Sequence, residues 1–167
     1  MSAILSRCQW VLILSFLLLL AVPVPLVARA AATPSVTLDW EEQTLWQLIR
    51  DARAGAGLPA VAENNQVVVL ARERSTDMVA RHYFDHYAPD GLTFLDLMPR
   101  YGLTSPHAGE TLQENNRADS PTEAARALIA SPEHHAVLFD ARYTIGGVGH
   151  AVDGNGVHYF TMIFVQA

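Results

Sequence analysis

Hydrophobic and polar residues alternate along the chain with a helical period in three separate stretches. The first covers residues 38–52 and is followed by a segment rich in Gly and Pro at 55–59, which favours a helix end. A second runs from Glu63 to Tyr83. A third, short one covers Thr93–Arg100, after a Pro-Asp-Gly turn signal. The first half of the chain is therefore predicted to be helical.

A fourth helix carries the strongest start signal. Ser120 is expected to be its N-cap, with Pro121 at the first helical position and Glu123 completing a capping box. The helix should stop before Pro132, which opens another short helical turn.

The C-terminal part changes to the pattern of strands. Residues 144–152 and 157–166 are rich in Gly, Val, Tyr, Phe and Ile, and an Asp-Gly-Asn-Gly turn separates them, so they predict a β-hairpin. A weaker strand signal covers 109–112. Helices followed by strands imply an α+β domain in which helices pack on an antiparallel sheet.

An export signal is predicted at the N-terminus. Residues 10–22 are apolar except for Ser15, and residues 1–30 contain no acidic residue and end in a small-x-small site, Ala28-Arg29-Ala30. Residues 1–30 therefore predict a secretory signal peptide. The alternative is an uncleaved N-terminal anchor, since the apolar run approaches the length of a short membrane span. The expected location is secreted or extracellular, or within the cell envelope including the periplasm.

The rest of the chain is predicted to be one acidic domain. Residues 31–37 are expected to form a linker and residues 38–167 the domain, because no repeat or second linker follows. Residues 31–167 contain 9 Arg, no Lys and 17 acidic residues, a formal charge of −8. Binding to nucleic acid or to an anionic membrane needs clustered positive charge, so neither is an expected partner. Contact with a membrane is expected only through an uncleaved N-terminal segment.

The motifs of several enzyme classes are missing from the sequence. A chain without Lys has no G-x-x-x-x-G-K phosphate loop, and neither a G-x-S-x-G elbow nor an H-E-x-x-H zinc helix occurs. The only cysteine, Cys8, lies in the predicted signal, so no disulfide is expected in the domain, which suggests a bacterial exported protein. Seven histidines and neighbouring carboxylates remain as candidates for zinc binding or proton transfer.

Six short motifs occur in an order that is similar to that of a known family. They are Leu48-Ile49-Arg50 with Arg53 and Gly57-Leu58-Pro59; Ala71 to Met78; Tyr83-Phe84-Asp85-His86 followed by Pro89-Asp90-Gly91; Gly109-Glu110; Ser131-Pro132-Glu133-His134; and Tyr143-Thr144 with Gly147-Val148-Gly149. Each motif is weak alone. Together, over residues 45–164, they resemble the CAP superfamily (cysteine-rich secretory proteins, antigen 5 and pathogenesis-related proteins) in its disulfide-free bacterial form.

The resemblance implies an α-β-α sandwich, with helices on both faces of a small antiparallel sheet, and an open cavity lined by His and Glu. His86, Glu110 and His134 match the family's cavity residues. Ser131 stands where the family's second Glu would lie, so the resemblance implies three polar cavity residues and not four. Glu133 is a candidate substitute carboxylate, although its position beside His134 favours a side chain that points away.

Two interpretations of these residues remain open. His86 and His134, with Glu110, form a ligand set that zinc accepts. Alternatively, the three side chains form a hydrogen-bonded cluster that ties the helices to the sheet. Of the other histidines, His150 and His158 are expected to pair across the hairpin.

Three functions follow as hypotheses. The first is a secreted binding module, with no established reaction, whose cleft takes a small-molecule, lipid or envelope ligand. The second is a zinc-dependent hydrolase in which His86 and His134 hold the metal and Glu110 is a ligand or general base. The third is a purely structural or adhesive envelope domain. Zinc is the one candidate cofactor, and catalysis is the less favoured interpretation.

Overall fold

The structure is a computed structural model, and it describes residues 36–167. The predicted signal peptide at 1–30 and most of the predicted linker at 31–37 lie outside the described residues. Within residues 36–167, no helix is both long and apolar enough to cross a membrane.

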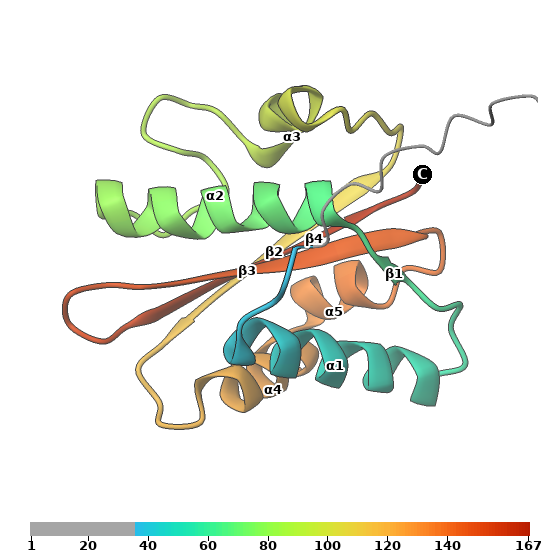
Figure 1. Cartoon of the computed structure of the whole chain (residues 1–167). Helices are drawn as coiled ribbons and strands as arrows, with labels where there is room; N and C mark the ends of the chain where they lie inside the picture. Colours follow the sequence, from blue (N-terminus) through green and yellow to red (C-terminus); the bar gives the residue numbers. More distant parts are fainter. Residues whose placement is uncertain (1–35) are drawn as a thin grey trace, which may run out of the picture. The chain divides into compact units, whose positions relative to one another are not determined.

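A four-stranded sheet forms the middle layer (Figure 1). Its strands are β1 (Ala62–Glu63), β2 (Ala108–Asn115), β3 (Ile145–Val152) and β4 (His158–Val165), in the order β1-β3-β4-β2. The long strands are antiparallel, because β4 pairs with both β2 and β3 in that sense. The two-residue β1 joins β3 in parallel, so the sheet is mixed. Two residues give no alternating pattern, and the sequence analysis did not predict this strand.

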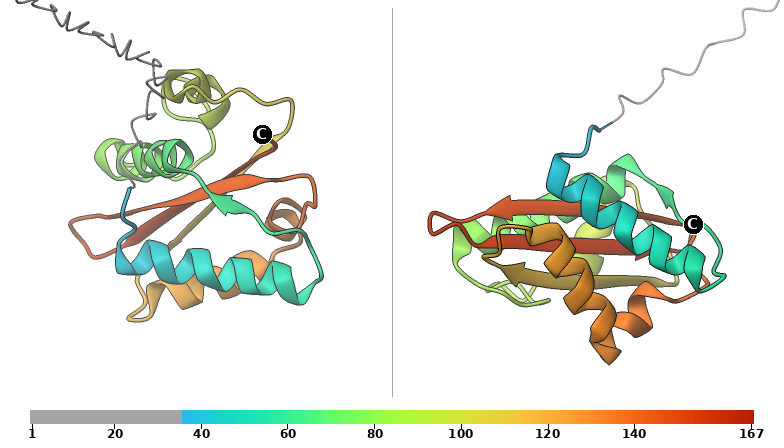
Figure 2. Two further views of the ribbon diagram at one scale, coloured as in Figure 1. Left: turned by 45° about the vertical axis from the view of Figure 1, so that its right-hand side comes forward. Right: turned by 90° about the horizontal axis from the view of Figure 1, so that it is seen from below.

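Helices cover both faces of the sheet, which confirms the α-β-α sandwich. The helices on one face are α1 (Trp40–Gly55), α4 (Ser120–Ala130) and α5 (Pro132–Leu138); the opposite face carries α2 (Asn65–Arg81), α3 (Phe94–Leu97) and the 3₁₀ turn η1 (Met98–Tyr101). Seen from below, α1, α4 and α5 cross in front of the strands (Figure 2).

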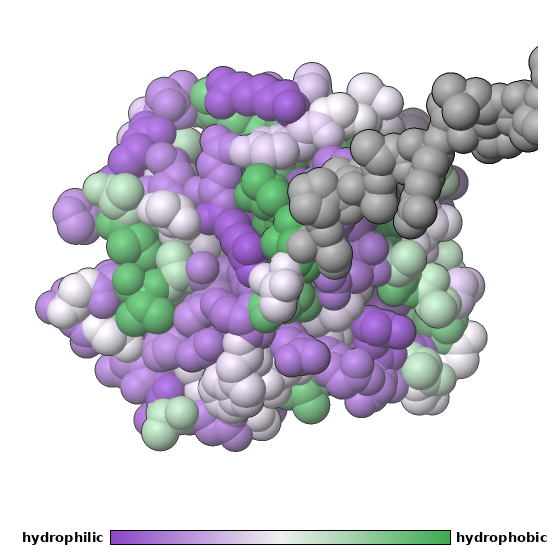
Figure 3. Space-filling model, viewed as in Figure 1, coloured by the Kyte–Doolittle hydropathy of each residue, from purple (hydrophilic) through white to green (hydrophobic). Residues whose placement is uncertain are grey.

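Each face buries its own hydrophobic core. On the α1 face the core includes Leu45, Trp46, Leu128, Val148, Phe160 and Phe164, and on the α2 face it includes Val67, Leu70, Phe94, Met98 and Ile163. On β4, even-numbered residues such as Phe160 face the α1 side and odd-numbered ones such as Ile163 face the α2 side, so the strand supplies both cores by alternation. The face drawn in Figure 3 is mostly hydrophilic and carries smaller, separate hydrophobic patches.

The start of each long helix is fixed by a side chain. Asp39 and Glu42 form a reciprocal capping box at α1, with the Glu42 N–H donating to Asp39 Oδ1 at 2.7 Å. Asn64 caps α2 by accepting from the N–H groups of Gln66 and Val67. Helix α2 ends at Arg81, two residues before the predicted end, because His82 adopts a left-handed conformation with φ of 58°.

The predicted capping box of the fourth helix is wrong. Asp119 is the N-cap residue of α4, and Ser120 already belongs to the helix. The Ser120 side chain is buried, and its hydroxyl has no hydrogen-bond partner within the described chain. Glu123 instead bonds Arg126, with 2.6 Å between Oε2 and Nη2. Burial of Ser120 against the core therefore outweighs the local capping signal.

Two glycines of β3 let α2 lie directly on the sheet. A Cβ atom at Gly147 would collide with the backbone of Val67 and Val68, and one at Gly149 with the backbone of Ala71 and Arg72. Glycine is therefore required at both positions by the close approach of the helix, not by its own φ angle.

Candidate functional site

Glu110 is the centre of a buried polar network on the α2 face. It lies on β2 directly opposite Ile163 of β4, and its side chain is 1% exposed. Arg74 of α2, also 1% exposed, donates from Nε to Glu110 Oε1 at 3.1 Å. The ion pair joins α2 to the edge strand of the sheet. Because both side chains are buried, removal of either one would leave an uncompensated buried charge, which is costly.

Arg74 also fixes the loop that follows α2. Its Nη1 donates to the Tyr83 hydroxyl at 2.9 Å, and its Nη2 donates to the backbone oxygens of Asp85 and His86 at 3.0 and 2.9 Å. The Tyr83 hydroxyl in turn donates to Asp77 at 2.7 Å. Burial and the Asp77 carboxylate raise the pKa of Tyr83 to about 12. One guanidinium therefore holds both Glu110 and the backbone of the His86 loop.

His86 completes the network at the surface. Its Nδ1 lies 2.7 Å from Glu110 Oε2, and the side chain is 49% exposed. The hydrogen bond to Glu110 raises the pKa of His86. Both oxygens of Glu110 are therefore occupied, one by Arg74 and one by His86.

His134 approaches from the other side of the sheet edge without joining the network. It lies on α5, and its Nδ1 is buried with no hydrogen-bond partner in the described part of the chain. Burial, followed by the nearby charge of His86, lowers the pKa of His134. Ser131 is half-buried between α4 and α5, where its backbone oxygen accepts from the His135 N–H. Glu133 is exposed.

The sequence analysis missed Arg74, although the sequence contained a signal for it. Arg74 follows Val67 and Leu70 and precedes Met78 at helical spacing, so it lies on the apolar face of α2. An arginine on a buried face requires an acidic partner, because an unpaired buried charge is costly. That requirement could have linked it to Glu110.

The network fits a metal poorly. A catalytic zinc site uses three protein ligands. Here both oxygens of Glu110 accept hydrogen bonds, from Arg74 and in the contact with His86, so a metal would have to displace one of these contacts to gain a carboxylate ligand. A different triplet has the spacing of a metal site. Within residues 36–167, one donor atom each of Glu41, His150 and His158 lies within 4.8 Å of the other two.

The pKa shifts predict opposite pH behaviour of the two histidines. We expect His86 to titrate above about 6.5 and His134 below it, measured by NMR of the ring carbons. The stabilisation by His86 is complete below about pH 6.5 and is lost as the pH rises through its raised pKa. The contribution of neutral His134 to the free energy of unfolding is complete above about pH 6.5 and is lost as the pH falls toward and through its lowered pKa.

A matched pair of variants checks the cause of the His86 shift. Glu110→Gln should lower the pKa of His86 toward its ordinary value, whereas Glu114→Gln, on the same strand but exposed, should leave it unchanged. Titration of His86 below His134 would contradict the assignment.

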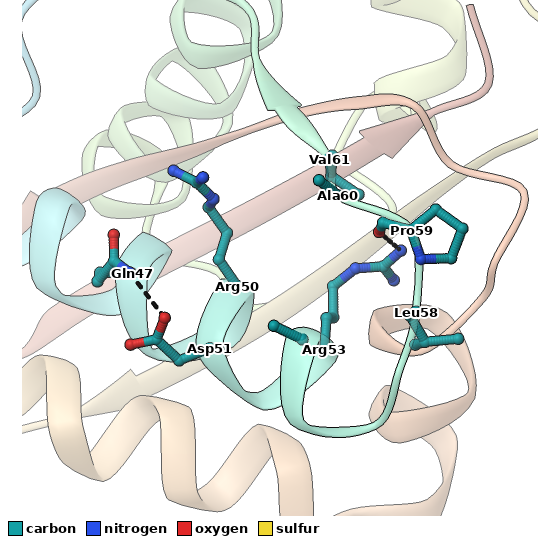
Figure 4. Close-up of a pocket in the computed structure, with 9 residues that line it drawn as sticks. Gln47, Arg50, Asp51, Arg53, Leu58, Pro59, Ala60 and Val61 are labelled. Atoms are coloured by element: carbon teal, nitrogen blue, oxygen red, sulfur yellow. Dashed lines mark hydrogen bonds between the residues drawn. The ribbon is translucent and has the colours of Figure 1, made fainter.

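Two pockets have none of these histidines among their lining residues. One, of about 130 Å³, lies at the C-terminal end of α1 and is lined by Arg50, Asp51, Leu58, Pro59 and neighbouring residues (Figure 4). Arg53 lies in its wall, where it donates to the backbone oxygens of Pro59 and Leu138 and so joins α1 to the end of α5. The other, of about 230 Å³, is lined by charged residues that include Arg74, Asp77, Arg81 and Asp90, so it borders the network on the side of the Arg74 guanidinium. Neither is lined by His86, Glu110 or His134.

Comparison with known proteins decides the family. The family model described as the cysteine-rich secretory protein family, CAP, matches residues 46–164. The chain belongs to the CAP family. The resemblance inferred from the six motifs is therefore confirmed.

Bacterial proteins are among the relatives of this CAP domain. YkwD of Bacillus subtilis is 27% identical over 124 residues, which are 74% of this chain and 47% of YkwD. An extracellular protein of Bacillus anthracis with an SCP domain has a TM-score of 0.65 and 23% identity, over 80% of this chain and 45% of that one. An outer surface protein of Borrelia burgdorferi has a TM-score of 0.70 and 15% identity, over 78% of this chain and 96% of that one. The chain spans about half the length of the two Bacillus relatives.

Proposed function

We propose that this CAP domain is an exported binding module that holds an amphipathic ligand with an anionic head group at the His86 loop. The observation that carries the proposal is the composition of this loop around a half-exposed imidazole. Phe84 and Tyr87 are 41% and 65% exposed, on either side of His86 in the sequence. Exposed aromatic side chains beside a fixed polar group are typical of ligand sites.

The charges of the network favour an anionic head group. Arg74 balances the charge of Glu110, and the raised pKa of His86 favours its protonated form at mildly acidic pH. The exposed imidazole is then a hydrogen-bond donor with a positive charge on an otherwise acidic domain. His134 stays neutral over a wider pH range and offers a second polar contact.

The hydrolase hypothesis has no supporting observation in this geometry. Glu110 contacts Arg74 and His86 with its two oxygens, so it is neither a free metal ligand nor a free base. Its position resembles that of a carboxylate that orients a histidine. Binding without a reaction is therefore the function that the site supports best.

A fluorescent long-chain fatty acid tests the proposal. We expect saturable binding to the full chain, weakened at least about ten-fold in the double variant Phe84→Ala/Tyr87→Ala, because both aromatic contacts are lost. Leu95→Ala removes a similarly exposed apolar side chain, 52% exposed, from α3 and should leave affinity unchanged. Equal affinity in all three proteins, or no saturable binding, would overturn the proposal.

A further inference from the structure

A second cluster of histidines lies at the hairpin end of the sheet, on the α1 face. His150 of β3 and His158 of β4 are diagonal neighbours, since His150 lies opposite Phe160 and His158 opposite Val152. Their rings contact, with 2.9 Å between His150 Nε2 and His158 Nδ1, which confirms the predicted pairing across the hairpin. Glu41, in the first turn of α1, supplies a carboxylate to the same point.

We propose that Glu41, His150 and His158 bind a zinc ion. One donor atom from each side chain lies within 4.8 Å of the other two. Two imidazoles and one carboxylate are a ligand set used by catalytic zinc sites, which keep a fourth position open. Tetrahedral zinc with bonds of about 2.05 Å needs its nitrogen ligands about 3.3 Å apart. The two ring nitrogens, 2.9 Å apart, therefore have to separate by a few tenths of an ångström, and the rings have to turn so that both lone pairs meet at the ion.

One of the two rings is already held by a carboxylate and by packing. His150 Nδ1 lies 3.2 Å from Asp39 Oδ2, and when its proton is donated to this carboxylate, His150 Nε2 accepts the hydrogen bond from His158 Nδ1. Zinc would take the place of that proton, with His158 carrying its ring proton on Nε2 instead, so that both facing nitrogens offer a lone pair. The His150 side chain is 6% exposed and stacks on Phe160 with 4.7 Å between the ring centres. A histidine oriented by a carboxylate and fixed by packing loses little freedom on metal binding.

Arg72, which bonds the start of α1, is paired with a residue outside the triplet. Arg72 donates from Nε to Glu42 Oε1 at 2.6 Å and from Nη2 to the Thr37 backbone oxygen at 2.8 Å. The guanidinium of Arg72 is therefore already paired with the buried carboxylate of Glu42. Asp39 and Glu41 remain as two carboxylates that offset the charge of a divalent cation.

The proposed zinc site is independent of the His86 network. On β4, His158 is five residues from Ile163, the partner of Glu110, which corresponds to about 17 Å along the strand. The two sites also lie on opposite faces of the sheet. Loss of one can therefore be distinguished from loss of the other.

Calorimetric titration of the full chain with Zn²⁺ tests the proposal, with Co²⁺ absorption as a second readout of coordination geometry. We expect one ion per chain and at least about ten-fold weaker binding in Glu41→Gln and in His158→Gln. Asp39→Asn keeps a capping residue but removes the charge that orients His150, so it should weaken binding about ten-fold. Zinc should also raise the Tm of the wild-type chain and not of His158→Gln.

Two histidine variants serve as controls. His135→Gln changes an exposed histidine that stacks on Phe139, and His86→Gln changes the other site; both should bind zinc as the wild type does. Absence of zinc binding would overturn the proposal. Binding that survives Glu41→Gln and His158→Gln, or that is lost in His86→Gln, would overturn it as well.

Discussion

Replacement of Arg74 by Ala is expected to lower the free energy of unfolding by about 3–5 kcal/mol. The variant leaves the Glu110 carboxylate, 1% exposed, without its cationic partner. It also removes the Arg74 N–H groups that donate to the Tyr83 hydroxyl and to two backbone oxygens in the His86 loop. Urea unfolding followed by circular dichroism measures the loss.

Arg81→Ala is the matched control for this prediction. Arg81 lies on the same helix and pairs with Asp77 and Asp90, but all three side chains are at least 30% exposed. Exposed pairs contribute little, so this variant should unfold close to the wild type. A loss of stability in Arg74→Ala no larger than in Arg81→Ala would show that the buried ion pair does not stabilise the fold.

Gly149→Ala is expected to destabilise the domain by about 3 kcal/mol, or to prevent folding altogether. The added Cβ atom would overlap the backbone of Ala71 and Arg72, so relief requires a shift of α2 and not a side-chain rotation. Because α2 carries Arg74, we also expect the His86 ring signals to change in NMR spectra. Thermal unfolding measures the effect on stability.

Gly154→Ala tests whether the effect comes from the close approach. Gly154 lies in the hairpin turn, and nothing lies within 4 Å of the position of its Cβ. The free energy of unfolding should change by less than about 0.5 kcal/mol. Similar losses at both positions would instead point to a general cost of replacing glycine in the hairpin.

Periodicity predicted the long helices, because each has one continuous buried face, whereas composition and a turn signal predicted the β3–β4 hairpin. The apolar pattern at 38–52 corresponds to α1, and the weak strand signal at 109–112 lies in the first part of the longer β2. Boundaries were predicted less well because tertiary contacts decide them. Ser120 is taken into α4 by burial, and α2 stops at a left-handed His82 that no local residue preference announces.

The sequence predicted the individual residues of the candidate site, but not the contacts that connect them. Motif positions gave His86 and Glu110, whose contact at 2.7 Å depends on the pairing of β2 with β4 and on the turn after α2. The helical spacing of Arg74 places it on the buried face of α2, but no spacing shows that it also binds the backbone of the His86 loop, and none shows that His134 stays outside the hydrogen bonds. The approach of Glu41 to His150 and His158 spans more than a hundred residues, so it too is visible only in three dimensions.

The order of the strands has a consequence for how the chain folds. The last strand in the sequence, β4, lies between β3 and β2 and is hydrogen-bonded to both. Strand β2 has no other partner in the sheet, so it cannot pair until residues 158–165 have been synthesised. Pairing over such sequence distances is slow, because the ends of a long loop must first meet. During synthesis the domain is therefore expected to remain without its three long paired strands until residues 158–165 have emerged from the ribosome, and chaperones can bind the unpaired strands until then.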